Sequence, residues 1–131
     1  MANGKPDFSK EVKYNNKSYK ICVFVENTDY SVHVCSDDNF SFTPVIFNSV
    51  DKIKFDNAQS KEKEINIFVE WAETFPFNSG INWYDDYKKN VSHLNKQDEN
   101  YFFEHLTFCV EEQIKNGLIK NNTTNLTQAS N

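Results

Sequence analysis

The sequence predicts an α+β fold, in which an antiparallel meander of five to six strands is followed by two C-terminal helices. Between about residues 8 and 73, apolar residues occupy every second position of short segments that polar turns separate. After residue 81 the spacing of the apolar residues becomes that of a helix. Because the sheet face and the helical stripes must all be buried, we expect the two helices to pack on one face of the sheet.

The first three strands are predicted together with their pairing. Apolar residues alternate with other residues over positions 19–25 and 30–34, and a turn at residues 26–29 separates the two segments. The pairing that brings the apolar residues to one face is Val25 with Tyr30, Val23 with Val32, and Ile21 with Val34. A turn at residues 15–16 adds a strand to this face, with Val12 opposite Tyr19 and Phe8 opposite Val23.

Three further strands complete the predicted meander. Residues 40–47 are a candidate fourth strand, with an edge position or a bulge at Pro44, because proline lacks the N–H group that a central strand needs. Ile53 and Phe55 alternate with lysines over residues 50–55, which predicts a fifth strand. A sixth is predicted over residues 64–71, where every second residue is apolar: Ile65, Ile67, Val69 and Trp71.

Two helices are predicted in the C-terminal part of the chain. Over residues 81–94 the apolar side chains fall on one side of a helix: Trp83, Tyr84, Tyr87, Val91 and Leu94. A second helix is expected to begin at Asp98, a favourable N-cap residue, and to end at Gly117, where glycine suits a left-handed cap. Its apolar stripe comprises Phe102, Phe103, Leu106, Cys109, Val110 and Ile114.

The chain has the length of one ordinary domain. Its 131 residues, of which 15% are aromatic, provide enough apolar area for one core that needs no cofactor. We therefore predict a single domain over residues 1–120. Residues 121–131 are polar and low in complexity, so we expect them to form a disordered tail.

The charge composition restricts the class of partner. The net charge is -5, and all 14 cationic residues are lysines. Arginine supplies the planar fork that binds phosphates and guanine, so its absence argues against nucleic acid as a partner. An acidic chain is instead suited to a protein partner with a basic surface.

Two features favour a cytoplasmic protein. The first residues lack the apolar run of a signal peptide, and no window of the sequence is apolar enough for a membrane span. The three cysteines are odd in number and contain no CxxC pair, which suits free thiols in a reducing compartment. The 18 asparagines and the lysine bias suggest an A+T-rich genome, either bacterial or phage.

Familiar catalytic motifs are absent. The chain has only three glycines, which excludes a GxGxxG loop, a P-loop and a GxSxG elbow. Neither HExxH nor an EF-hand loop occurs. Asp37, Asp38 and Asn39 are typical of a turn. The sequence therefore favours a protein that is not an enzyme.

Histidines and cysteines raise two chemical alternatives. His33 and Cys35 on a strand, with His105 and Cys109 on a helix, are possible ligands of a zinc ion. The predicted architecture disfavours this site, because His33 and Cys35 point away from the face that the helices cover. Cys22 lies opposite His33, as a nucleophile and its base would, but no third residue orients the imidazole.

The remaining candidates form a surface for a partner. Aromatic side chains beside carboxylates are typical of protein-binding patches. The candidate residues are Phe24, Phe68, Asp85, Asp86, Tyr101, Glu104, His105, Phe108, Glu111 and Glu112.

These observations lead to two hypotheses of function. The first is a small acidic binding protein that occludes a partner's surface, as toxin-immunity proteins and phage inhibitors of host defence do. The alternative is a small enzyme or ligand-binding domain, with a pocket between sheet and helices lined by Trp71, Trp83, Tyr84 and Tyr87. The sequence leaves the oligomeric state open, and a subunit of a larger assembly is a third possibility.

Overall fold

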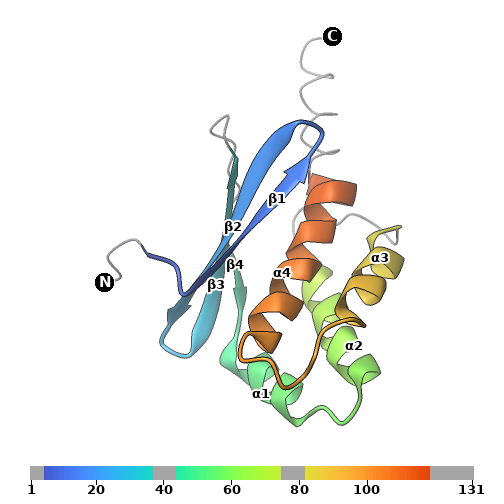
Figure 1. Cartoon of the computed structure of the whole chain (residues 1–131). Coiled ribbons are helices and arrows are strands. Elements are labelled where there is room, and N and C mark those ends of the chain that lie inside the picture. Colours follow the sequence, from blue (N-terminus) through green and yellow to red (C-terminus); the bar gives the residue numbers. More distant parts are fainter. Residues whose placement is uncertain (1–4, 37–43, 75–81, 119–131) are drawn as a thin grey trace. The chain divides into compact units, whose positions relative to one another are not determined.

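The computed structural model describes residues 5–36, 44–74 and 82–118 (Figure 1). The chain divides into two compact units, Met1–Ile67 and Phe68–Asn131, and each is described by itself. We refer to them as the sheet unit and the helical unit. The predicted α+β class is confirmed, with four strands in one antiparallel sheet and four α-helices in the described part of the chain. The predicted tail at residues 121–131 lies outside the described residues.

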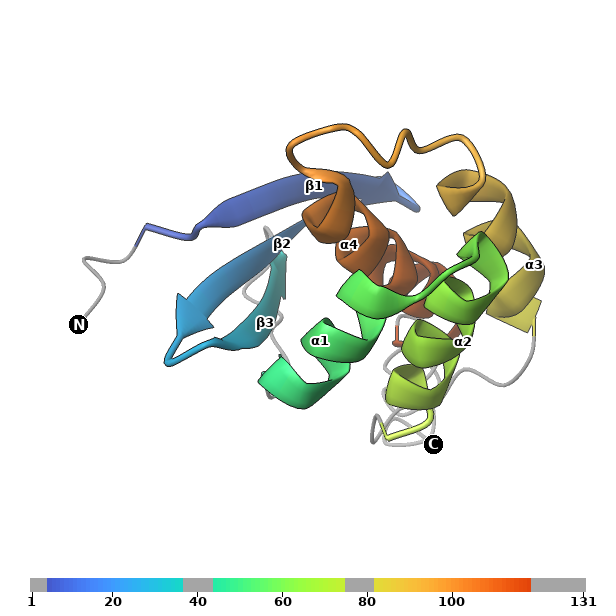
Figure 2. The same cartoon turned by 90° about the horizontal axis from the view of Figure 1, so that it is seen from below.

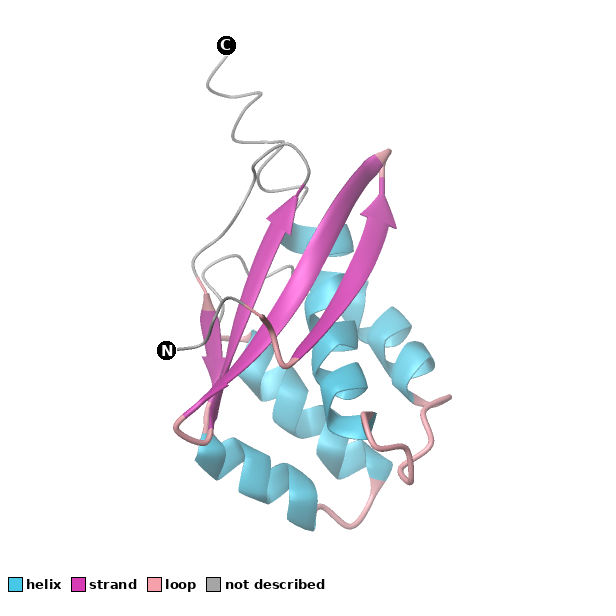
Figure 3. Cartoon of the chain, turned by 60° about the vertical axis from the view of Figure 1, so that its left-hand side comes forward, coloured by secondary structure: helices cyan, strands magenta, loops and turns pink. Residues whose placement is uncertain are grey.

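The sheet has its strands in sequence order. It comprises β1 (Phe8–Tyr14), β2 (Lys17–Glu26), β3 (Asp29–Ser36) and β4 (Val45–Phe47), each antiparallel to the next (Figure 3). Every pairing that the alternation predicted for β1, β2 and β3 is confirmed. Both hairpins close through two-residue turns, at Asn15–Asn16 and at Asn27–Thr28.

The confirmed register collects the buried residues on one face of the sheet. The nearly fully buried ones are Val12, Tyr19, Ile21, Val23, Val32, Val34 and Phe47. The opposite face carries residues such as Lys20, Cys22 and His33, which are exposed or half-buried. Side chains of adjacent residues point to opposite faces of a strand, so the pattern of the sequence alone separates the two faces.

The fourth strand is shorter than predicted. It begins only after Pro44, which has no N–H group to donate to a neighbouring strand. Among the residues that the structure describes, β4 pairs only with β3 and so forms an edge of the sheet, one of the two alternatives predicted. The first part of the predicted strand, residues 40–43, lies outside the described residues.

The predicted fifth and sixth strands are wrong, because both segments are helices. α1 (Ser49–Asn57) begins at Asn48, whose side chain accepts a hydrogen bond from the Asp51 N–H at 2.8 Å. Lys52 and Asp56 pair one turn apart on it, at 2.8 Å. α2 (Lys61–Ala72) buries residues at helical spacing: Ile65, Phe68, Trp71 and Ala72. The predicted two-residue alternation over residues 64–71 did not include Phe68 and Ala72. The spacing of these two buried residues from Ile65 and Trp71 is that of a helix.

Both predicted C-terminal helices are present. They are α3 (Asn82–Val91) and α4 (Tyr101–Gln113), which contact each other (Figure 2). α4 begins after Asn100 rather than at Asp98, because Asp98 lies in a turn closed by its N–H bond to the Asn95 carbonyl. A π-helix, η1 (Ile114–Leu118), follows α4, so Gly117 does not cap the helix there.

The turn between β2 and β3 contains a strained residue, and its replacement is expected to stabilise the protein. Thr28 has φ 72°, a left-handed conformation that a β-branched side chain disfavours. Thr28→Gly should raise the free energy of unfolding by about 0.5–1 kcal/mol in urea denaturation. Asn16→Gly at the matching position of the other turn should gain less, because asparagine tolerates φ 64°. An equal or larger gain at Asn16 would contradict this account.

Candidate functional site

A buried histidine lies at the centre of the helical unit. The His105 side chain is fully buried, and its Nδ1 shares a hydrogen bond of 2.9 Å with the Tyr87 hydroxyl on α3. The Phe68 ring stacks on the imidazole with centroids 4.8 Å apart. The Tyr101 ring meets it edge-on at 5.7 Å. These contacts give His105 a structural role between α3 and α4.

Four of the predicted surface residues therefore belong to the interior. Phe68 was predicted to contact a partner, but it lies in α2 and is fully buried. Tyr101, His105 and Glu112 are also buried. The residues on α4 were predicted to be exposed because they lie beside its apolar stripe. The sequence of one helix does not reveal how much of its circumference the neighbouring helices cover.

A polar cluster joins α3 to the end of α4. Glu112 is only 2% exposed, and its carboxylate accepts a hydrogen bond from Asn90 Nδ2 of α3 at 3.0 Å. It accepts another from Asn116 Nδ2 of η1 at 3.3 Å. Lys115 Nζ lies 3.0 Å from a Glu111 oxygen and 3.9 Å from a Glu112 oxygen. We call these residues, together with Asp86, the Glu112 junction.

The surroundings of the Glu112 junction raise the pKa of Glu112 and the pKa of Lys115. Burial raises the pKa of Glu112, and the charges of Glu111 and Asp86 raise it further, against the opposing effects of Lys115 and of the Asn90 hydrogen bond. Burial by itself would lower the pKa of Lys115. The hydrogen bond and charge of Glu111, with the charges of Glu112 and Asp86, outweigh burial and raise that pKa. Lys115 therefore stays cationic, while Glu112 holds its proton more tightly than an ordinary glutamate.

Of the predicted surface residues, the exposed carboxylates lie on α3, and two less exposed carboxylates lie along one side of α4. Asp85 and Asp86 are exposed. Glu104, Phe108 and Glu111 are half-buried and are spaced four and three residues apart, which places them on one side of α4. An aromatic ring is thus flanked by two carboxylates along this helix. Of the predicted surface, these five residues form what we call the acidic surface.

Phe24, the remaining predicted partner residue, lies in the sheet unit. It is half-buried on the less buried sheet face, where its ring meets the His33 ring edge-on at 5.1 Å. The His33 Nε2 atom shares a hydrogen bond of 3.2 Å with the Ser31 hydroxyl. Cys22 faces His33 directly across the strands, as predicted.

Two of the three thiols, those of Cys22 and Cys109, are poorly suited to nucleophilic catalysis. Burial raises the pKa of Cys22, and Cys35 raises it further, against a smaller lowering by Lys20. Cys109 is fully buried, which raises the pKa of its thiol well above the usual value, and the thiol donates to the Phe68 carbonyl at 3.8 Å. A thiol that holds its proton is a weak nucleophile.

The possible zinc ligands are divided between the two units. His33 and Cys35 belong to the sheet unit, and His105 and Cys109 to the helical unit. Across residues 5–36, 44–74 and 82–118, no group of three or more His, Cys, Asp or Glu side chains is arranged to hold a metal ion.

The aromatic residues proposed to line a pocket largely pack against one another. Trp71, Trp83 and Tyr87 are buried, and the Trp83 and Tyr87 rings lie 5.3 Å apart. Tyr84 is half-buried, with the Lys88 ammonium 4.9 Å from the centre of its ring.

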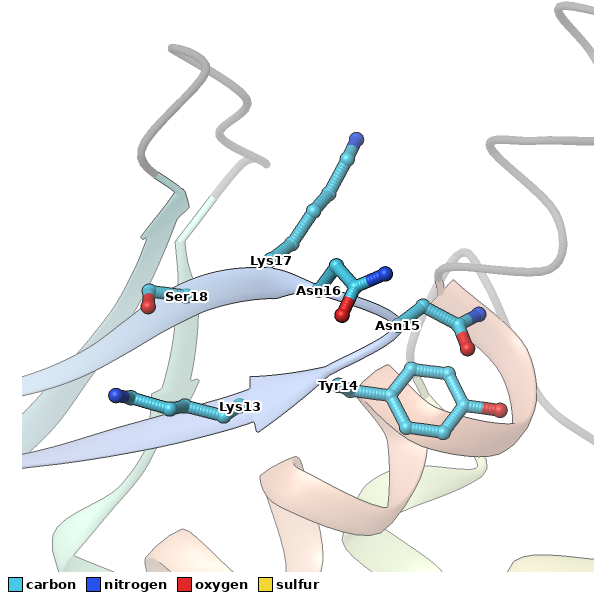
Figure 4. A pocket seen from close by; sticks show the side chains of 6 residues that line it. All are labelled: Lys13, Tyr14, Asn15, Asn16, Lys17 and Ser18. Atoms are coloured by element: carbon cyan, nitrogen blue, oxygen red, sulfur yellow. The ribbon is translucent and has the colours of Figure 1, made fainter.

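A surface depression occurs at the β1–β2 turn (Figure 4). It is lined by Lys13, Tyr14, Asn15, Asn16, Lys17 and Ser18. The side chains of Lys13, Tyr14 and Lys17 point in different directions, so no set of polar groups converges on a ligand there.

Removing the buried hydroxyl of Tyr87 is expected to destabilise the helical unit. Tyr87→Phe deletes the hydrogen bond to His105 and should lower the free energy of unfolding by about 1–2 kcal/mol. Urea denaturation followed by circular dichroism measures this change. Tyr84→Phe is the matched control, because its half-exposed hydroxyl should contribute less than about 0.5 kcal/mol. Equal effects of both variants would contradict the structural role of the hydroxyl.

The three thiols are expected to react with a disulfide reagent in a fixed order. Cys35 is exposed and should react first, followed by the half-buried Cys22, whose raised pKa leaves less thiolate. Cys109 should react only after unfolding, because it is buried. Stopped-flow absorbance at neutral pH resolves the kinetic phases of the thiol reactions, and Cys35→Ser should remove the fastest phase. A fast phase that survives in this variant would contradict the assignment.

Comparisons with protein-family models, with curated proteins and with solved structures find no match to this chain. The described helices are all too short or too polar to cross a membrane.

Proposed function

We propose that this protein is a non-enzymatic binding protein that neutralises a partner protein by covering a basic part of its surface. Toxin-immunity proteins and phage anti-defence proteins work in this way. The observation that carries the proposal is the distribution of charge. The helical unit holds nine carboxylates and five lysines, so it carries -4 of the net charge of -5.

The acidic surface has the composition of a binding site for a basic protein. Asp85 and Asp86 are exposed, so their field reaches into solvent, where the exposed Lys88 and Lys89 of the same helix partly offset it. The carboxylates would accelerate encounters with a positively charged partner that approaches their side of α3. Phe108 lies between Glu104 and Glu111 on α4 and offers an aromatic contact once the partner has docked. Charge would thus govern the rate of association, and the aromatic ring would slow dissociation.

The state of the thiols also supports a binding role. The raised pKa of Cys22 and of Cys109 keeps both thiols protonated at neutral pH. The buried His105 is held by aromatic rings and by the Tyr87 hydroxyl, which is the environment of a structural histidine. Neither arrangement resembles an activated nucleophile with its base.

The proposal is tested by charge reversal on α3. A partner captured from the native host is purified, and its association with the wild type and with Asp85→Lys/Asp86→Lys is followed by surface plasmon resonance. The variant should associate about tenfold more slowly at low ionic strength, and the difference should shrink as salt is added. Dissociation should change much less, because exposed charges act mainly on encounter.

The matched control reverses two exposed carboxylates of the sheet unit. Glu26→Lys/Glu62→Lys changes the net charge by the same amount but leaves α3 and α4 intact. Its association rate should stay within about twofold of the wild type. Equal slowing by both variants, or no slowing by either, would refute a partner site on the acidic surface.

A further inference from the structure

β1 forms one edge of the sheet, and it is long and regular. Among the described residues it pairs only with β2, and this pairing is continuous from Phe8 to Tyr14 (Figure 1). Natural sheets usually protect an edge by a very short strand, a proline or a bulge, because an open edge can pair with another strand. β4, at the other edge, has only three residues and follows Pro44. β1 has none of these three features.

The hydrogen-bonding pattern between β1 and β2 determines which main-chain groups of β1 face outward. Tyr14 and Lys17 flank a two-residue turn and form the hydrogen-bonded pair that closes such a hairpin. Hydrogen-bonded pairs recur at every second position of two antiparallel strands, so Phe8 and Val23 form another one. The Val23 carbonyl agrees with this assignment, because it accepts a hydrogen bond from the Asp7 N–H at 2.8 Å and so points toward β1.

The residues between these pairs offer their main chain to the edge. They are Ser9, Glu11 and Lys13, whose N–H and C=O groups point away from β2. Their side chains are exposed on the less buried face of the sheet. The open edge therefore presents main-chain donors and acceptors beside one carboxylate and one ammonium group.

We infer that β1 binds a second copy of this chain, by pairing antiparallel with the β1 strand of that copy about a twofold axis. This inference goes beyond the proposed binding function. Its test uses the purified chain without a partner, so a failure of either proposal is distinguishable from a failure of the other.

Charge complementarity favours a second copy and selects one register. Hydrogen bonds across the new interface must join residues whose main chain faces outward. The register centred on Val12 places Glu11 opposite Lys13 of the second copy, and symmetry repeats this pair. The neighbouring registers centred on Glu11 and on Lys13 place two carboxylates or two ammonium groups directly opposite each other, which is unfavourable.

The rest of β1 is compatible with this register. On the buried face, Lys10 lies opposite Tyr14 of the second copy and so meets no like charge. The sheet unit carries only -1 of the net charge of -5, so two copies can approach through it with little repulsion. One pair of strands is a small interface, and exposed ion pairs contribute little energy, so the dimer should be weak.

The test is sedimentation velocity of the wild type and of three charge variants over a wide range of concentration at low ionic strength. The wild type should show an equilibrium of monomer and dimer. Glu11→Lys and Lys13→Glu each place like charges opposite each other at both symmetric positions, and each should weaken the dissociation constant about tenfold. The double variant Glu11→Lys/Lys13→Glu restores opposite charges, so its dissociation constant should return to within about threefold of the wild type.

The double variant also provides the matched control. Glu11 lies opposite Lys20 of its own sheet, and Glu11→Lys alters this contact in the single and the double variant alike. A difference between these two variants therefore reports the contact with the second copy. A wild type that stays monomeric, equal affinities of all four proteins, or a double variant as weak as Glu11→Lys would each overturn the inference.

A second measurement needs no variant. Hydrogen exchange of the Glu11 and Lys13 amides should slow several-fold as the protein concentration rises, because these amides become bonded to the second copy. The Lys10 and Val12 amides already face β2, so their exchange should depend much less on concentration. Exchange at Glu11 and Lys13 that is independent of concentration would overturn the inference. Protection that arises only when another protein is added would also overturn it, because the edge would then bind a partner's strand.

Discussion

Two buried polar side chains on α4 constrain the helical unit, because a polar group removed from water must find a hydrogen-bond partner. His105 and Glu112 are these residues, and α3 supplies a partner for each through Tyr87 and Asn90. Apolar packing of two helices tolerates sliding and rotation, whereas two directional bonds at separate points do not. The position of α3 on α4, and with it that of the exposed Asp85 and Asp86, depends on these bonds.

The sheet could be predicted from the sequence because its determinants are local. Alternating side chains and two short turns are sufficient to define the pairing of β1, β2 and β3. The helices α1 and α2 were missed because apolar residues in a short helix can also match a two-residue period, as Ile65, Ile67 and Val69 do. The signals that could have identified them were the Asn48 cap and the positions of Phe68 and Ala72.

The candidate site could be predicted only in part. Its exposed carboxylates, Asp85 and Asp86, were identified because charged residues on a helix normally face solvent. The burial of Tyr101, His105 and Glu112 could not be predicted, because it depends on which residues of other helices lie against them. Asn90 and Asn116 were missed for the same reason, because no pattern in the sequence indicates which asparagine will contact a buried carboxylate.

The compact connections of the meander have a consequence for how the chain acquires its structure. Two-residue turns at Asn15–Asn16 and Asn27–Thr28 connect β1, β2 and β3. Because these turns are so short, the entropic cost of closing them is small. Contacts between segments so near in sequence form rapidly, and little chain entropy is lost before they are made. We expect the first hairpins to assemble during synthesis, while the ribosome still holds the residues of α3 and α4.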